Sequence, residues 1–227
     1  MGRHTLHGNP PIDVTLRKSA QARRLSLRIS RLDGRVTLTM PQGAPDREGI
    51  AFLRDKESWL RGHLDKMAPS EMVRIGSIVP VQGRGRVVTQ GARLRLLEDR
   101  IEVPVTRSTG VAVRARLRAM ARDALAEASD RYAASLGLSY NRLSIRDTRS
   151  RWGSCSSKGV LMYSWRLIMA PPAVLDYVAA HEVAHLREMN HSAAFWAVVA
   201  QLCPDYDQHR HWLRTNGESL HRLRFDD

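Results

Sequence analysis

One segment of this chain is constrained more tightly than any other, because it places two histidines and a glutamate at fixed angles around a helix. The pattern is His-Glu-x-x-His, at His181, Glu182 and His185. Four residues of α-helix turn by about 400° and rise about 6 Å, so both imidazoles leave the same face one turn apart. There they can bind one metal ion at about 2.0–2.1 Å. Glu182 lies about 100° around the helix, where a carboxylate can take a proton from metal-bound water.

The metal needs a third protein ligand, and His191 is the best candidate. On a straight helix His191 would lie about 15 Å beyond His181, so the chain must leave the helix first. We expect Asn190 to end the helix in the left-handed conformation, which asparagine tolerates, and to turn His191 back towards the metal. The weaker candidates for this third ligand are Glu188, Asp205, Asp207, His209 and His211.

The other patterns predict an α+β fold with a β-rich N-terminal half and a more helical C-terminal half. Residues 23–30 alternate between apolar and polar side chains, and the alternation resumes over 36–40 after a hairpin-type turn at Asp33-Gly34. The remaining predicted elements are a helix over 45–67, short strands over 74–105, an amphipathic helix over 111–136 that ends at Gly137, and the metal-motif helix that starts at Pro171-Pro172.

The composition changes near Thr106–Gly110, and we place a domain boundary there, between a β-rich region 1–110 and a region 111–227 that holds the metal motif. Residues 1–110 carry 20 basic and 11 acidic side chains, which is +9 of the chain's net charge of +13. This excess favours an anionic partner such as nucleic acid, although a solvated outer sheet face would look the same. The basic residues in question are Arg17, Lys18, Arg23, Arg24, Arg28, Arg31 and Arg35.

The cysteines and the hydropathy pattern bear on where the protein works. Cys155 and Cys203 are 48 positions apart, and no Cys-x-x-Cys pair occurs, which excludes a cysteine-based structural zinc site and argues against a disulfide framework. No stretch approaches the roughly 18 apolar residues of a membrane span, and the first residues lack the apolar region of a secretory signal. We therefore expect a cytoplasmic protein without membrane association.

A second cluster of residues precedes the metal motif. It begins with Arg151-Trp152-Gly153-Ser154-Cys155 and continues into a strand that ends in Trp165-Arg166-Leu167. Residues 23–29 add an alternating strand pattern near the N-terminus. Together with His181 to Leu186, Asn190 to Ser192 and Phe195-Trp196, these motifs resemble the YgjP-like metallopeptidase domain, a relative of the SprT-like zinc peptidases. The resemblance spans most of the chain.

The resemblance implies a zincin-like C-terminal half with an active-site helix beside a small sheet. It implies that Zn²⁺ is held by His181, His185 and His191, with Glu182 as the base. It also implies that a strand near the site lies alongside an extended protein or peptide substrate. Tyr163 on the neighbouring strand is a candidate to contact the substrate by stabilising an oxyanion.

Three functions remain open on these observations. The leading one is a zinc-dependent metallohydrolase, a metallopeptidase in which Glu182 activates zinc-bound water to cleave peptide bonds. The first alternative is a metal-dependent nucleotide pyrophosphohydrolase with arginines on the phosphates, although no P-loop or carboxylate-rich magnesium site is evident. The second alternative is a nucleic-acid-binding protein with an auxiliary metal site, which would bind through its basic N-terminal half.

Overall fold

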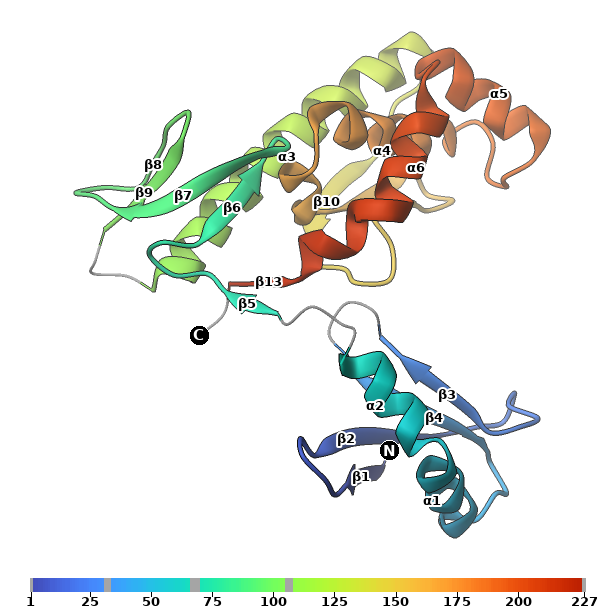
Figure 1. Cartoon of the computed structure of the whole chain (residues 1–227). Helices are drawn as coiled ribbons and strands as arrows, with labels where there is room; N and C mark the ends of the chain where they lie inside the picture. Colours follow the sequence, from blue (N-terminus) through green and yellow to red (C-terminus); the bar gives the residue numbers. More distant parts are fainter. Residues whose placement is uncertain (1, 31–33, 66–69, 105–107, 226–227) are drawn as a thin grey trace. The chain divides into compact units, whose positions relative to one another are not determined.

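The computed structural model describes residues 2–30, 34–65, 70–104 and 108–225 (Figure 1). These residues form helices and several small sheets, so the α+β class is confirmed. The contacts within the chain divide it into two compact units, residues 1–70 and 71–227. The change in composition that we placed near residue 110 therefore lies inside the second unit, where α3 (Thr109–Ser135) packs on strands that precede it.

The first unit contains a four-stranded sheet with two helices. Its strand order is β1-β2-β4-β3, in which β2 and β4 are parallel and the outer pairs are antiparallel. The alternation in the sequence places Val14, Val36, Leu38 and Met40 in a fully buried core. The elements are β1 (Gly2–Leu6), β2 (Ile12–Ser19), β3 (Ser26–Ile29), β4 (Val36–Pro41), α1 (Asp46–Asp55) and α2 (Glu57–Asp65).

Two predictions for this unit are refined by the structure. The helix predicted over 45–67 is two helices, because the regular pattern is interrupted at Lys56. The alternating segments pair as antiparallel β3 and β4, and Gly34 has a φ of 68°, which a turn glycine adopts easily. Asp33 of the predicted turn lies outside the described residues.

The second unit begins with β5 (Glu71–Met72) and a four-stranded sheet of order β6-β7-β9-β8. Strands β6 (Ile78–Val81) and β7 (Arg84–Gln90) form a hairpin. Its two connecting residues, Gln82 and Gly83, both have positive φ, which matches the twist of a two-residue hairpin. The sheet is completed by β8 (Arg95–Leu96) and β9 (Arg100–Val103).

The long helix α3 ends where the sequence predicts. Gly137 has a φ of 66°, and the N–H groups of Gly137 and Leu138 donate to the carbonyls of Ala134 and Ala133. This is the glycine-terminated end expected of a helix whose last carbonyls need partners. Val113, Leu117, Ala121 and Leu125 are fully or almost fully buried along one face of α3, while its opposite face is exposed.

The segment after α3 forms the sheet and helices around the metal motif. Strands β10 (Arg142–Arg146), β11 (Gly153–Cys155) and β12 (Val160–Ser164) make a sheet of order β10-β12-β11, with β10 parallel and β11 antiparallel to β12. No described helix is long and apolar enough to cross a membrane. The remaining elements are η1 (Trp165–Met169), α4 (Pro172–Ala184), α5 (Ala193–Leu202), α6 (Tyr206–Asn216), η2 (Gly217–His221) and β13 (Leu223–Arg224).

A buried arginine connects this sheet to the C-terminal segment. Arg166, only 6% exposed, donates from Nε to Asp147 Oδ1 at 2.8 Å. Its Nη1 donates to the carbonyls of Leu220 and Leu223 at 2.8 and 3.0 Å. Because β13 pairs with β5, this one guanidinium links η1 to both ends of the second unit.

We predict that Arg166→Met lowers the free energy of unfolding by about 3 kcal/mol at pH 7, because it removes the ion pair with Asp147 and leaves the carbonyls of Leu220 and Leu223 without this donor. Burial alone would raise the pKa of Asp147, but the hydrogen bond and charge of Arg166, with smaller effects of a hydrogen bond from Trp165 and the charge of His221, outweigh burial and lower that pKa. A lowered pKa in the folded state adds stability above the unfolded pKa of about 3.9 and loses it as the pH falls further.

The difference between wild type and Arg166→Met, measured by urea unfolding, should therefore shrink as the pH falls below about 4. The exposed Arg214 supplies the matched control, since Arg214→Met should change stability by less than about 0.5 kcal/mol. Equal losses for the two variants would contradict the role assigned to Arg166.

Candidate metal centre

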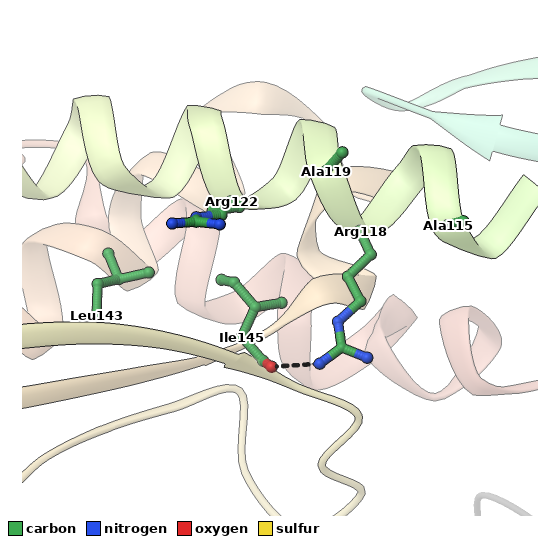
Figure 2. Close-up of a pocket in the computed structure, with 6 residues that line it drawn as sticks. All are labelled: Ala115, Arg118, Ala119, Arg122, Leu143 and Ile145. Atoms are coloured by element: carbon green, nitrogen blue, oxygen red, sulfur yellow. Dashed lines mark hydrogen bonds between the residues drawn. The ribbon is translucent and has the colours of Figure 1, made fainter.

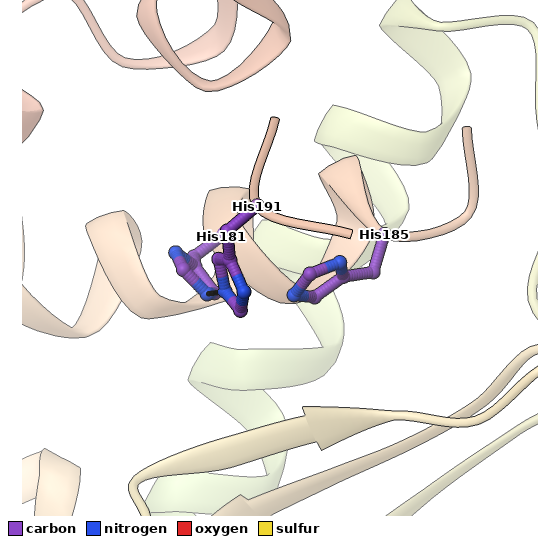
Figure 3. Close-up of side chains that lie close together, drawn as sticks. All are labelled: His181, His185 and His191. Carbon is purple, nitrogen blue, oxygen red and sulfur yellow. Dashed lines mark hydrogen bonds between the residues drawn. The ribbon is translucent and has the colours of Figure 1, made fainter. Parts of the chain in front are cut away.

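The structure brings the three predicted histidines together. His181 lies in α4, His185 is its C-terminal cap residue, and His191 lies in the turn before α5. One ligand nitrogen from each ring lies within 4.8 Å of the other two (Figure 3). His185 is buried, His181 is half-buried and His191 is exposed. A metal held by these rings would therefore be reachable from solvent on the His191 side.

The chain returns to the metal motif in a way that differs from our prediction. Asn190 does not have a positive φ, and α4 already ends at Ala184. The last turn tightens through hydrogen bonds between residues three apart, as in a 3₁₀-helix. The N–H of Leu186 donates to the carbonyl of Val183, and the N–H of Arg187 donates to the carbonyl of Ala184. A helix that ends this way needs no left-handed residue. Asn190 acts later, because its side-chain oxygen accepts the N–H of Ser192 at 3.1 Å and shapes the turn that holds His191.

The hydrogen bonds around the rings select the nitrogens that face a metal. His185 Nδ1 lies 2.9 Å from the carbonyl oxygen of Glu188. A carbonyl only accepts, so Nδ1 carries the hydrogen and Nε2 keeps its lone pair for a metal. The Nε2 atoms of His181 and His191 lie 3.1 Å apart. His181 Nδ1 is buried and has no partner in the described part of the chain, so only Nε2 of that ring meets another polar atom.

The charge states of the rings also suit a metal. Burial, followed by the charges of the neighbouring His185, His191 and Arg210, lowers the pKa of His181 to about 3. Burial likewise lowers the pKa of His185. Both rings are therefore neutral at physiological pH, and the neutral imidazole is the form that binds a metal.

The distance between two of the three ligand nitrogens matches a tetrahedral ion. Bonds of about 2.05 Å in a tetrahedron put ligand atoms about 3.3 Å apart, close to the 3.1 Å between His181 and His191. Three neutral imidazoles with an open fourth position are a common ligand set for catalytic zinc. The residues present therefore fit a zinc ion.

Glu182 lies beside this group and against strand β11. A β-carbon at Gly153 would lie 2.5 Å from Glu182 Oε1, so only glycine leaves room for the carboxylate. Burial raises the pKa of Glu182 to about 8, against the opposing effects of the Arg151 charge and a hydrogen bond from the main-chain N–H of Cys155. The sequence pattern indicated Glu182 but not its contacts with Gly153 and Cys155. The glycine within the Arg-Trp-Gly-Ser-Cys cluster is the sequence feature that could have indicated a close approach there.

Aromatic side chains of α5 form a wall against the histidines. Phe195 is fully buried and stacks on His185, with ring centroids 4.4 Å apart and planes at 26°. Phe195 and Trp196 both contact His181 and His191 as well. Ser192 caps α5 by accepting the N–H of Phe195. The wall restricts the rotation of all three imidazoles, which holds them in position before any metal binds.

The structure does not support the substrate contact that we predicted for Tyr163. This side chain is 0% exposed, and its hydroxyl lies 3.0 Å from Ser129 Oγ on α3. Its position on β12, the middle strand of the sheet, explains the burial. A substrate cannot reach a hydroxyl enclosed in this way, so Tyr163 belongs to the packing between sheet and helix.

The neighbouring candidates also have defined places. Burial, followed by the charge of Glu182, raises the pKa of Cys155 to about 11, so this residue stays a thiol and is a poor nucleophile. Glu188 acts through its main-chain oxygen rather than its carboxylate. Among the described residues, none of the weaker ligand candidates Glu188, Asp205, Asp207, His209 and His211 joins the three histidines.

The basic residues of the first unit lie mainly on the solvent side of its sheet. Arg17 and Arg28 are exposed and alternate with the buried or half-buried apolar residues of β2 and β3. Lys18 forms an ion pair with Asp46 at 3.0 Å. Arg31 lies outside the described residues. Nucleic-acid binding by this unit stays a prediction.

Comparison with known protein families gives the class of protein to which this chain belongs. The family model of the YgjP-like metallopeptidase domain matches residues 23–216. The chain therefore belongs to the YgjP-like family, and membership implies a peptidase whose site holds a metal ion. No curated protein was found to be similar to the chain.

One similar solved structure is the metallopeptidase zymogen of Pyrococcus abyssi abylysin, which is 20% identical to this chain. The similarity covers 40% of this chain and 92% of that chain, with a TM-score of 0.37. A likeness this weak carries no argument about the site.

We predict that His185→Ala lowers metal affinity by about tenfold or more, because it removes one of the three ligand groups that the described part of the chain brings together. The check is the metal content of the folded protein after zinc loading and dialysis. His209→Ala is the matched control, and it should retain the metal of the wild type. Unchanged metal content in His185→Ala would show that the ion binds elsewhere.

Proposed function

We propose that this chain is a zinc-dependent peptidase in which Glu182 is the general base. The observation that carries the proposal is the convergence of three imidazoles from α4 and the following turn, with the buried carboxylate of Glu182 next to His181 in α4. Two of these imidazoles, His181 and His185, are neutral at physiological pH. Zinc supplies a Lewis acid that lowers the pKa of water and polarises the scissile carbonyl. Borderline-soft nitrogen ligands favour zinc over magnesium or calcium, which take oxygen ligands.

Glu182 is suited to carry the proton. Hydrolysis of a peptide bond takes one proton from the attacking water and delivers one to the nitrogen of the departing amine. Burial raises the affinity of Glu182 for a proton, and a bound cation would favour its ionised form, so the carboxylate can accept the first proton and donate it afterwards. The N–H of Cys155 donates a hydrogen bond to the carboxylate and holds it at the edge of β11. The carboxylate is therefore held in one orientation while it takes the proton from water and while it delivers the proton to the amine nitrogen.

The position of β11 supports a peptide substrate. Main-chain bonds from Ser164 to Trp152 and from Ser156 to Val160 show that residues 152, 154 and 156 face β12. By alternation, the main-chain groups of Gly153 and Cys155 face outward, on the open side of the sheet and beside Glu182. We propose that an extended substrate pairs with this edge, so that its scissile bond lies next to the histidines.

We also propose that the protein works in the cytoplasm on protein or peptide substrates. Cys155 and Cys203 are both free thiols, and free thiols are typical of reducing compartments. A peptide-pairing strand edge beside Glu182 favours peptides over the nucleotides considered from the sequence, since a nucleotide has no main chain to pair with it.

We predict that Glu182→Gln keeps the bound metal and reduces turnover about 100- to 10,000-fold, because glutamine has a similar shape but accepts no proton. The measurement is cleavage of a fluorescein-labelled unfolded protein by zinc-loaded and chelator-treated enzyme, together with metal content. Phosphate release from nucleoside triphosphates without protein cleavage would support the pyrophosphohydrolase instead. Full cleavage activity in Glu182→Gln would refute the proposed base.

A second prediction concerns the glycine that faces the base. Gly153→Ala should reduce turnover about 10- to 100-fold with unchanged metal content, because the new methyl group displaces the Glu182 carboxylate. Gly62→Ala is the control, since no atom lies within 4 Å of a β-carbon added there. A Gly153→Ala enzyme as active as Gly62→Ala would mean that the carboxylate position is unimportant.

A further inference from the structure

The second edge of the active-site sheet is also open, and its chemistry is different. The main-chain N–H and C=O groups of successive β12 residues point to opposite sides of the strand. Those of Ser164 and Val160 form hydrogen bonds with β11, so those of Leu161 and Tyr163 point towards β10. In the parallel register, residues 142, 144 and 146 of β10 then face β12. The main-chain groups of Leu143 and Ile145 therefore face away from the sheet, and no other described strand pairs with them.

This edge borders a groove between β10 and helix α3. The groove has a volume of about 560 Å³, and Figure 2 shows its lining, with two arginines on the α3 side and two apolar side chains on the β10 side. Arg118 reaches from α3 to the carbonyl oxygen of Ile145 at 2.9 Å, which confirms that this carbonyl points outward. The lining residues are Ala115, Arg118, Ala119, Arg122, Leu143 and Ile145.

The groove is positively charged. Arg118 and Arg122 are both exposed and lie one turn apart on α3, and no acidic residue lines the groove. Neither guanidinium forms an ion pair within the described part of the chain. Arg118 uses one nitrogen for Ile145, which leaves its other donors for a ligand.

We propose that this groove binds an extended acidic peptide segment as an added strand on β10. The segment's main chain pairs with the outward N–H and C=O of Leu143 and the outward N–H of Ile145. Its carboxylates on the α3 side bind Arg118 and Arg122 by charge-assisted hydrogen bonds. The site lies on the opposite edge of the sheet from β11 and Glu182, and it stands independently of the proposed peptidase chemistry.

The lining favours a peptide over a nucleic acid. Single-stranded nucleic acids bind through basic grooves that also offer aromatic rings for the bases to stack on. The floor of this groove is Ala115, Ala119, Leu143 and Ile145, with no aromatic side chain. Its distinguishing feature is a row of outward main-chain groups, and a peptide main chain matches that row while a phosphate backbone does not.

The test is binding of a short fluorescein-labelled peptide in which Glu and Thr alternate, followed by fluorescence anisotropy on the full chain. We expect Arg118→Glu/Arg122→Glu to weaken binding about tenfold or more, and the same peptide with Gln in place of Glu to bind about as weakly. Arg116→Glu is the matched control, because Arg116 is exposed on α3 but does not line the groove. It should change affinity by less than about twofold.

Two N-methylated peptides separate strand pairing from simple charge attraction. One carries methyl groups on the Glu nitrogens and the other on the Thr nitrogens, so that only one of them loses the N–H groups that face β10. That peptide should bind about tenfold more weakly than the other. Equal affinity of the two methylated peptides would overturn the strand pairing.

Two further outcomes would also overturn the proposal. One is an Arg116→Glu variant that binds as weakly as the double variant. The other is a single-stranded oligothymidylate that binds the groove more tightly than the peptide and is lost in the double variant, which would make the surface a nucleic-acid site. Because binding is measured rather than cleavage, a negative result here leaves the peptidase function to be judged by Glu182→Gln.

Discussion

The separation between α4 and β11 is set by the close contact of Gly153 with Glu182, and the geometry of the candidate centre depends on it. A β-carbon at position 153 would lie 2.5 Å from the Glu182 carboxylate, so any other residue would push the helix or the carboxylate away. With glycine in place, the carboxylate reaches the N–H of Cys155 while the two histidines of the same helix stay one turn apart beside it. Because Gly153 has no β-carbon, the carboxylate of Glu182, the edge of β11 and the histidines of α4 can lie close together.

Burial gives these groups their chemical properties. The same apolar surroundings raise the pKa of Glu182 and lower the pKa of His181 and His185, because each shift favours the neutral form. Neutral imidazoles are ready to bind a cation without first losing a proton. A bound cation would in turn favour the ionised form of Glu182, so metal binding and the readiness of the base are coupled through the electrostatics of one small volume.

The parts of the site that depend on helix periodicity could be predicted from the sequence, and the parts that depend on tertiary contacts could not. The spacing of His181, Glu182 and His185 determines their angles around α4 whatever surrounds the helix. Asn190 was expected to end that helix, but short-range bonds in the last turn end it earlier, and sequence patterns do not reveal such bonds. Tyr163 was placed near the site by its strand, but its burial depends on α3, which lies far away in the sequence. The change in composition near residue 110 likewise reflects charge, whereas the division into units reflects packing.

The two edges of the small sheet pose opposite physical problems. An open strand edge pairs readily with other chains, so a protein must either cover it or restrict what binds there. At β11 the outward groups lie beside Glu182, and pairing there would present a peptide to the candidate centre. At β10, Arg118 already occupies the Ile145 carbonyl, which shortens the free edge and places positive charge beside it. A neutral or basic strand would approach the positive charges of Arg118 and Arg122 without neutralising them. An acidic strand would gain charge-assisted hydrogen bonds to both. The same arginines would therefore protect the edge from indiscriminate pairing and select the kind of segment that binds it.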